Sequence, residues 1–391
     1  MKFLIIGKPE YTKDFTKQHD QASYFILDST QEDRLNLNSE LSNFLHSCSN
    51  EHIDLKIVAL PSGSVYKNTS SVARVIEDIR INFPELNIYI FGPSKDFAEI
   101  IDNKFKTHQL FKQQKIAGAL GVQEIDSFVT QSHYPVLIKH KSTSGGREML
   151  LINTDKEFRS WLSLNNDRTE LFYTEPFVNG IEISQSVLKF GTKIYALPQT
   201  VKPPTSPDEL RHSDQKPKFC GFFSQNTTAQ DSVIAIANEK MEAGILAGQF
   251  ICKSTSDTVI APIEIESRLT GSTPIMTSAA NFDIYEKIHT NISNQNESSL
   301  GFHIETLAPR RYSVQYISFS DKAHSSIDLE GVYQIKIEDH PANPKPRCRI
   351  NFAHRSLDEV FLLAQEIGKK INDPAFFSTI KKGYEEINHY S

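Results

Sequence analysis

Three charged residues alternate in the segment that follows Ala261. Glu264, Glu266 and Arg268 are spaced two apart, so a β-strand here would present two carboxylates and a guanidinium on one face. Adjacent carboxylates repel unless a cation lies between them, and Mg²⁺ is the usual cation where carboxylates and phosphates meet. Arg268 would then hold a phosphate or an acyl phosphate. A half-exposed surface strand shows the same alternation, so this interpretation needs support elsewhere.

A second candidate site is a strand, a small-residue loop and a returning strand. Tyr134–Lys139 is an apolar run that ends in a cation, and Met149–Asn153 is the second strand. The loop between them contains Ser144, Gly145 and Gly146, whose small side chains would let backbone N–H groups approach phosphate oxygens. The arrangement predicts a flap over a nucleotide, although a hairpin loop without a ligand has the same composition.

The segments that flank this flap carry further candidates. Asp102–Ile116 has the pattern of a basic helix, with Lys104 near its start either reaching a phosphate or lying on a solvated face. Asn179-Gly180 is a strong signal for a hairpin turn between two strands. A second hairpin is expected to place Gln249 beside Glu264. The polar segment 202–218 has the composition of a long loop, either a lid or an insertion.

Bulk composition excludes several classes of protein. The chain has 391 residues, which is long enough for two or three subdomains, and a formal net charge of -6, which argues against non-specific nucleic-acid binding. Its four cysteines form no Cys-x-x-Cys pair, so a reduced, cytoplasmic setting is expected. No apolar run reaches the roughly 20 residues that span a bilayer, so no membrane association is expected.

The order of expected elements predicts a mixed fold, α/β followed by α+β. Short apolar strands at 3–7, 56–60 and 87–92, with a helical pattern between the last two, indicate a small parallel sheet. No Gly-x-Gly-x-x-Gly follows these strands, so no dinucleotide site is inferred. Three expected strands at 311–320, 331–338 and 347–352, and a helix at 357–372, indicate a small C-terminal lobe.

Taken in order, these features resemble the ATP-grasp superfamily. The motifs are Lys104, then Pro135–Lys139 with Ser144–Met149, then Glu175-Pro176-Phe177 with Glu182, and finally Gln249 with Glu264–Arg268. The branch that the chain resembles is that of the carbamoyl-phosphate synthetase large chain, biotin carboxylase and glycinamide ribonucleotide synthetase. The resemblance implies a Rossmann-like pre-ATP-grasp domain at 1–100, an ATP-grasp domain at 101–310 with a flap at 128–190, and a C-terminal α+β lobe at 311–391.

The resemblance also implies roles for individual residues. Lys104 and Lys139 would contact the phosphates of ATP, and the loop of Ser144, Gly145 and Gly146 would cover them. Glu175 and the backbone of Phe177 would hold the adenine, and Glu182 the ribose. Gln249, Glu264 and Glu266 would bind Mg²⁺, with Mn²⁺ as an alternative metal. Arg147 and Arg268 would act in catalysis by steadying the transferred phosphoryl group.

Two residues depart from the superfamily pattern. Glu266 stands where most members have Asn, and Gln249 often corresponds to an acidic residue. The expected activity is a carboxylate–amine ligase that forms an acyl phosphate, with small-molecule acid and amine substrates, no nucleic acid, and a homodimer as in related enzymes. The alternatives are a nucleotide-binding module without turnover, and a carboxylase or carboxylate kinase that uses bicarbonate. Arg310, Arg311, His303 and the turn Thr270–Pro274 are candidates for contacting a second carboxylate.

Overall fold

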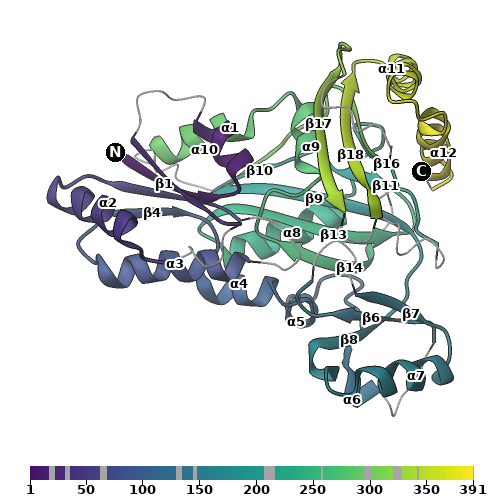
Figure 1. Cartoon of the computed structure of the whole chain (residues 1–391), viewed down its shortest axis with the longest axis horizontal. Helices are drawn as coiled ribbons and strands as arrows, with labels where there is room; N and C mark the ends of the chain where they lie inside the picture. Colours follow the sequence, from purple (N-terminus) through teal and green to yellow (C-terminus); the bar gives the residue numbers. More distant parts are fainter. Residues whose placement is uncertain are drawn as a thin grey trace.

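Three β-sheets organise the chain (Figure 1). The computed structural model describes residues 1–16, 23–30, 36–61, 68–128, 134–143, 148–206, 216–256, 259–294, 302–319, 327–340 and 343–390. The N-terminal sheet is parallel, a ten-stranded sheet forms the centre, and a small antiparallel sheet projects beside it. No helix in these ranges is long and apolar enough to cross a bilayer.

The N-terminal sheet confirms the expected parallel α/β unit. Its strands, in the order β2-β1-β3-β4, are β1 (Lys2–Gly7), β2 (Ser23–Asp28), β3 (Leu55–Leu60) and β4 (Ile88–Phe91). Its helices are α1 (Pro9–Thr16), α2 (Ser39–Asn50), α3 (Thr69–Asn82) and α4 (Lys95–Ile101). The strands are apolar because both faces are covered. One face packs on α2 and α3, and the other shares a core with the central sheet.

The central sheet carries most of the expected site. Its main path runs β14-β13-β9-β11-β12-β16-β18-β17, and β10 joins β9 to β15. The strands are β9 (Ile181–Phe190), β10 (Lys193–Ala196), β11 (Thr200–Lys202), β12 (Lys218–Cys220), β13 (Ala243–Cys252), β14 (Val259–Glu266), β15 (His303–Thr306), β16 (Tyr312–Phe319), β17 (Val332–His340) and β18 (Asn343–His354).

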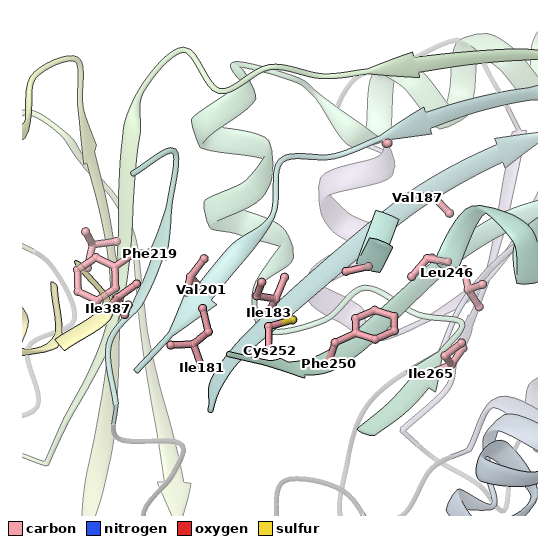
Figure 2. Close-up of a cluster of buried hydrophobic side chains, with 14 of the residues drawn as sticks. Ile181, Ile183, Val187, Val201, Phe219, Leu246, Phe250, Cys252, Ile265 and Ile387 are labelled. Carbon is pink, nitrogen blue, oxygen red and sulfur yellow. The ribbon is translucent and has the colours of Figure 1, made fainter. Parts of the chain in front are cut away.

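One face of this sheet is apolar along its whole length (Figure 2). Ile183, Val201, Phe219, Phe250 and Ile265 come from five successive strands of the main path and belong to one buried cluster. The helices that cover this face are α8 (Thr227–Lys240), α11 (Leu357–Lys370) and α12 (Phe376–Asn388). Since side chains alternate along a strand, the residues between these positions point to the opposite face. That opposite face is the one on which the site is built.

The small sheet contains the two strands expected to form the flap, and we call it the flap below, although its position over a nucleotide stays a prediction. Its order is β5-β8-β6-β7, and it pairs β6 with β7 as predicted for the two strands around the Ser/Gly loop. Its elements are β5 (Gln123–Glu124), α6 (Ile125–Phe128), β6 (Val136–His140), β7 (Met149–Ile152), α7 (Asp155–Asn165) and β8 (Phe172–Pro176). The helix before it, α5 (Lys104–Gln113), packs against β14 and so connects the flap to the central sheet.

Two features differ from the expectations. The Asn179-Gly180 turn does not make a hairpin, because β8 lies in the flap sheet and β9 in the central sheet. Gly180 crosses between them so close to β13 that a Cβ there would collide with the Cys252 carbonyl oxygen. The expected C-terminal strands exist as β16–β18, but they continue the central sheet. The boundary predicted at residue 310 therefore falls between strands of one continuous sheet. The division into domains at residues 100 and 310 stays a prediction.

The remaining helices lie beside the central sheet. They are α9 (Thr273–Ala280), which packs against β12, β16 and β18, and α10 (Ile284–Ser293), which packs against α1. Both contribute to the core shared with the N-terminal sheet through Ile275 and Ile288. The segment 267–272 between β14 and α9 is therefore short and is held at both ends by packed elements, next to the expected metal site.

Candidate active site

The expected metal ligands lie together on β13 and β14. Gln249 is the register partner of Glu264, as the sequence predicted, and Ala247 is the partner of Glu266. Ile265 and Phe250 point into the apolar cluster, so Glu264, Glu266 and Gln249 face the opposite side. Two carboxylates and an amide oxygen are hard ligands suited to Mg²⁺ together with phosphate oxygens. No group of three His, Cys, Asp or Glu side chains that could hold a metal is found in the described ranges.

Arg268 lies at the end of the same row. Its guanidinium donates a hydrogen bond to Oε1 of Glu266, whose side chain is almost completely buried. Burial would lower the pKa of Arg268, but the charges of Glu266 and Glu264 outweigh it and raise that pKa. Arg268 is therefore a permanent cation between the carboxylates and the turn that begins α9.

The flap contributes a buried charged cluster around Glu175. Its Oε1 atom accepts a hydrogen bond from Lys139, and its Oε2 atom lies 3.1 Å from His108 Nε2 and accepts a hydrogen bond of 3.1 Å from the Tyr173 hydroxyl. Burial would raise the pKa of Glu175, but Lys139 and His108 hold it down to about 2. Glu175 is thus ionised and oriented by three partners from β6, β8 and α5. Its role in adenine binding stays a prediction.

Lys104 is the first residue of α5, and it donates hydrogen bonds to the segment that follows β6. Its Nζ donates a hydrogen bond to the Thr143 carbonyl oxygen, and its backbone N–H donates one of 2.7 Å to the Lys141 carbonyl oxygen. Asn103 caps the helix by accepting from the N–H of Lys106. The fold therefore directs the two lysines expected at the phosphates, Lys104 and Lys139, toward the same end of the flap.

The flap and the central sheet meet at these residues. Burial raises the pKa of Tyr173, and the charges of Glu175 on its own strand and of Glu264 on β14 raise it further. Helix α5 makes the geometric connection, because it packs against β14 while its His108 lies 3.1 Å from Glu175 of the flap. Lys104 on α5 and Lys139 on β6 therefore lie on the side of the flap that adjoins β14.

Glu182 and Phe177 lie where the chain passes from the flap to the central sheet. Glu182 on β9 forms an ion pair with its register partner Lys202 on β11. The backbone N–H of Phe177 donates a hydrogen bond of 3.2 Å to the Pro135 carbonyl oxygen, so this N–H already has a partner within the flap. The ribose and adenine roles of these residues stay predictions.

Some expected residues are not placed at the site. Ser144, Gly145, Gly146 and Arg147 lie outside the described residues, as does 207–215 of the expected loop. His303 and Arg310 are exposed, whereas the Thr270–Pro274 turn contacts the polar face of the central sheet.

Sequence comparison finds no match, whereas structural comparison finds solved structures of the same fold. No family model matches the chain, and no curated protein has a detectably similar sequence. The biotin carboxylase domain of Hydrogenobacter thermophilus 2-oxoglutarate carboxylase, solved with MgADP and bicarbonate, superposes with a TM-score of 0.64 at 13% identity over 100% of this chain and 93% of that one. An L-amino acid ligase from Bacillus licheniformis gives 0.64 at 14% identity, over 94% and 97%.

A third neighbour completes the comparison. N5-carboxyaminoimidazole ribonucleotide synthetase from Thermus thermophilus gives a TM-score of 0.59 at 12% identity, over 100% of this chain and 92% of that one. All three neighbours are ATP-grasp enzymes. The chain has the ATP-grasp fold, as the order of motifs predicted. Its neighbours include the biotin carboxylase branch that its sequence resembles.

Several residues at the site escaped the sequence argument. They lie on the polar side of the fold next to an expected residue, and they are His108, Lys202, Lys218, Gln315 and Arg349. Their contacts join elements that are far apart in the chain, as in the pairing of Lys218 on β12 with Gln315 on β16. The only local signal in the sequence for any of these residues was the polar–apolar alternation of Lys218 and Phe219, which is typical of a strand with one polar face.

Proposed function

We propose that the chain is an ATP-dependent carboxylate–amine ligase that releases ADP and phosphate. The observation that supports this most is the pairing of Gln249 with Glu264 beside Glu266 and Arg268, near Lys104 on α5 and Lys139 in the flap. The neighbours supply the class: one is an amino acid ligase, and another was solved with MgADP.

The residues present suit Mg·ATP. A hard divalent cation would be held by Glu264, Glu266 and Gln249, and it would neutralise charge on the phosphates during transfer. Lys104 on α5 and Lys139 in the flap would add positive charge, and Arg268 would add it from the central sheet. Glu266, where most members have Asn, adds one negative charge to the site. Gln249, which often corresponds to an acidic residue, removes one, so the two differences cancel in net charge.

The proposed reaction has two displacements. A carboxylate oxygen of the acid attacks the γ-phosphorus of ATP, the bond to the β-phosphate oxygen breaks, and ADP leaves. The nitrogen of the amine then attacks the carbonyl carbon of the acyl phosphate, and phosphate leaves as the amide forms. We assign to Arg268, the ion-pair partner of Glu266, the stabilisation of negative charge on the transferred group in both steps.

A bicarbonate-using carboxylase is the second candidate. Two structures among the neighbours, both of a 2-oxoglutarate carboxylase biotin carboxylase domain, were solved with bicarbonate. Bicarbonate would then be the acid that receives the phosphoryl group. Dependence of ADP release on bicarbonate, with no requirement for another acid, would favour this candidate over the ligase.

The setting and assembly are also proposals. The four cysteines are free and buried, which supports a reducing, cytoplasmic compartment. One neighbour was solved as a biotin carboxylase domain dimer, so we propose a homodimer here, to be tested by light scattering of the purified protein.

The first test measures ADP and phosphate release from Mg·ATP with pooled carboxylates, each with and without amines. We expect release that requires one acid and one amine. Glu264→Ala should lower the rate by at least about 100-fold, because a ligand of the cation is lost. Glu99→Ala removes an exposed carboxylate from α4 and serves as the control. Equal activity of both variants would contradict the metal assignment.

A further inference from the structure

Strand β15 is an edge of the central sheet that carries exposed apolar side chains. It pairs with β10 on one side, and no strand in the described part of the chain pairs with its other side. Phe302, just before the strand, is 52% exposed, and Ile304 within it is 41% exposed. Edge strands of soluble proteins usually present charges or proline, because an open apolar edge pairs readily with another chain. The free edge of β15 is therefore suited to pairing with a second strand.

The backbone of Ile304 points away from the sheet. The His303 N–H donates a hydrogen bond of 3.0 Å to the Thr192 carbonyl oxygen at one end of β15. At the other end, the Leu307 N–H donates one of 2.8 Å to the Ala196 carbonyl oxygen. Since alternate residues of a strand direct their N–H and C=O groups to the same side, those of Ile304 are directed away from β10. Among the described residues they have no hydrogen-bond partner.

The side chains of β15 continue the two faces of the sheet. Ile304 is the register partner of Ile194, which is buried in the apolar cluster on the face covered by α8. His303 and Glu305 point to the opposite face, because side chains alternate along a strand. A strand added at this edge would extend the apolar face through Ile304, and on the other face it would meet an imidazole and a carboxylate.

These residues are complementary to a second copy of the same strand. In an antiparallel pair about a two-fold axis, Ile304 lies opposite a residue whose backbone also points outward, which is Phe302, Ile304 or Thr306. The first choice would set His303 against its own symmetry mate, and the last would set Glu305 against its mate. With Ile304 opposite Ile304, each His303 faces the Glu305 of the other copy. Only this register joins opposite groups on both sides of the axis.

We propose that two copies of the chain pair through β15 in antiparallel orientation, with the two-fold axis at Ile304. This inference supplies a surface for the homodimer proposed above, and it does not depend on the ligase activity. The pairing would join the central sheets of both copies into one sheet. Because β15 is short, the contact is smaller than that of a permanent dimer, and we expect a Kd on the order of 1–100 μM.

The test exchanges the two charged positions. Sedimentation equilibrium of the full-length chain, from about 1 to 200 μM, measures the Kd. We expect His303→Glu, which sets carboxylate against carboxylate, and Glu305→His, which sets imidazole against imidazole, each to raise the Kd about 10-fold. An equimolar mixture of the two variants should recover the wild-type Kd, because a mixed dimer again places imidazole opposite carboxylate at both positions. Lys382→Glu, on exposed α12, should leave the Kd unchanged.

A second variant tests the backbone of the same contact. Ile304→Pro removes an N–H that points away from β10, so the fold should be kept while a hydrogen bond between the copies is lost. Circular dichroism checks the fold. In the wild type, a higher protein concentration should slow amide exchange at Ile304 and Thr306, whereas His303 and Glu305, which bond to β10, should exchange slowly at every concentration.

The outcomes separate this inference from the proposed function. A wild-type chain that stays monomeric over the whole range would overturn the β15 contact. So would single variants that dimerise like the wild type, which would place the dimer on another surface, or a mixture that stays monomeric. No ADP release from a chain whose dimer responds to these changes would count against the ligase proposal alone.

Discussion

Three carboxylates of the proposed site form ion pairs with lysine or arginine side chains of the protein. Glu175 pairs with Lys139, Glu182 with Lys202, and Glu266 with Arg268. Each pair compensates a buried charge, and an isolated buried charge would lower the stability of the fold by several kcal/mol. A phosphate or a metal at the proposed site would compete with these partners, so binding would be an exchange of ion pairs. This exchange favours ligands that bring both a metal cation and phosphate anions, as Mg·ATP does.

Glu175 offers a test of this compensation at the level of one residue. Its pKa is about 2 in the folded protein, against an ordinary 4.5. Its ionised form therefore stabilises the fold above pH 4.5, and this contribution is lost as the pH falls toward 2. In Glu175→Gln, Lys139 loses its counter-ion, so the free energy of unfolding at pH 7 should fall by about 3 kcal/mol.

The measurement is urea unfolding of wild type and Glu175→Gln between about pH 7 and pH 3. The gap in stability should narrow below pH 4.5, because only the wild type has the ionised Glu175 carboxylate, whose contribution to stability is lost as the pH falls toward 2. Glu99→Gln, an exposed change on α4, should show a small and constant gap. A gap for Glu175→Gln that stays constant with pH would contradict the buried ion pair.

At the scale of elements, sequence patterns succeeded where a signal is local. The alternation around Ile265 and the short connection to β13 were sufficient to predict that Gln249 pairs with Glu264. The Asn179-Gly180 signal failed because a turn motif does not specify which sheets its flanking strands join. The contact of His108 with Glu175 could not be predicted, since it depends on how α5 packs against the flap.

Gly180 tests the connection between the two sheets. A methyl group at this position would collide with the Cys252 carbonyl oxygen on β13, which is backbone and cannot turn aside. Gly180→Ala should therefore displace the 177–180 linker and cost about 1–3 kcal/mol in the free energy of unfolding. It should also weaken ATP binding, because Phe177 and Glu182 flank this linker. Gly121→Ala, where a Cβ meets nothing within 4 Å, is the matched control.

At the scale of the whole molecule, the proposed site draws its residues from the central sheet and from the flap with the adjoining helix α5. Lys104 and Lys139 approach from the flap side, and Glu264 and Glu266 lie on the central sheet. A ligand that contacts both should restrain one relative to the other. At about 100 times its dissociation constant, Mg·ATP should stabilise the fold by roughly 2.7 kcal/mol. The gain should be visible as a higher melting temperature.

Hydrogen exchange locates where this stabilisation acts. We expect Mg·ATP to slow amide exchange in β6 and β8 of the flap and also in β13 and β14 of the central sheet, because one ligand joins both. Lys139→Met should lose most of the protection, whereas Lys156→Met, on the exposed surface of α7, should retain it. Protection confined to the flap would mean that the carboxylates of β14 do not hold the metal–phosphate group. The ligase proposal would then lose its central observation, even though the fold is that of an ATP-grasp enzyme.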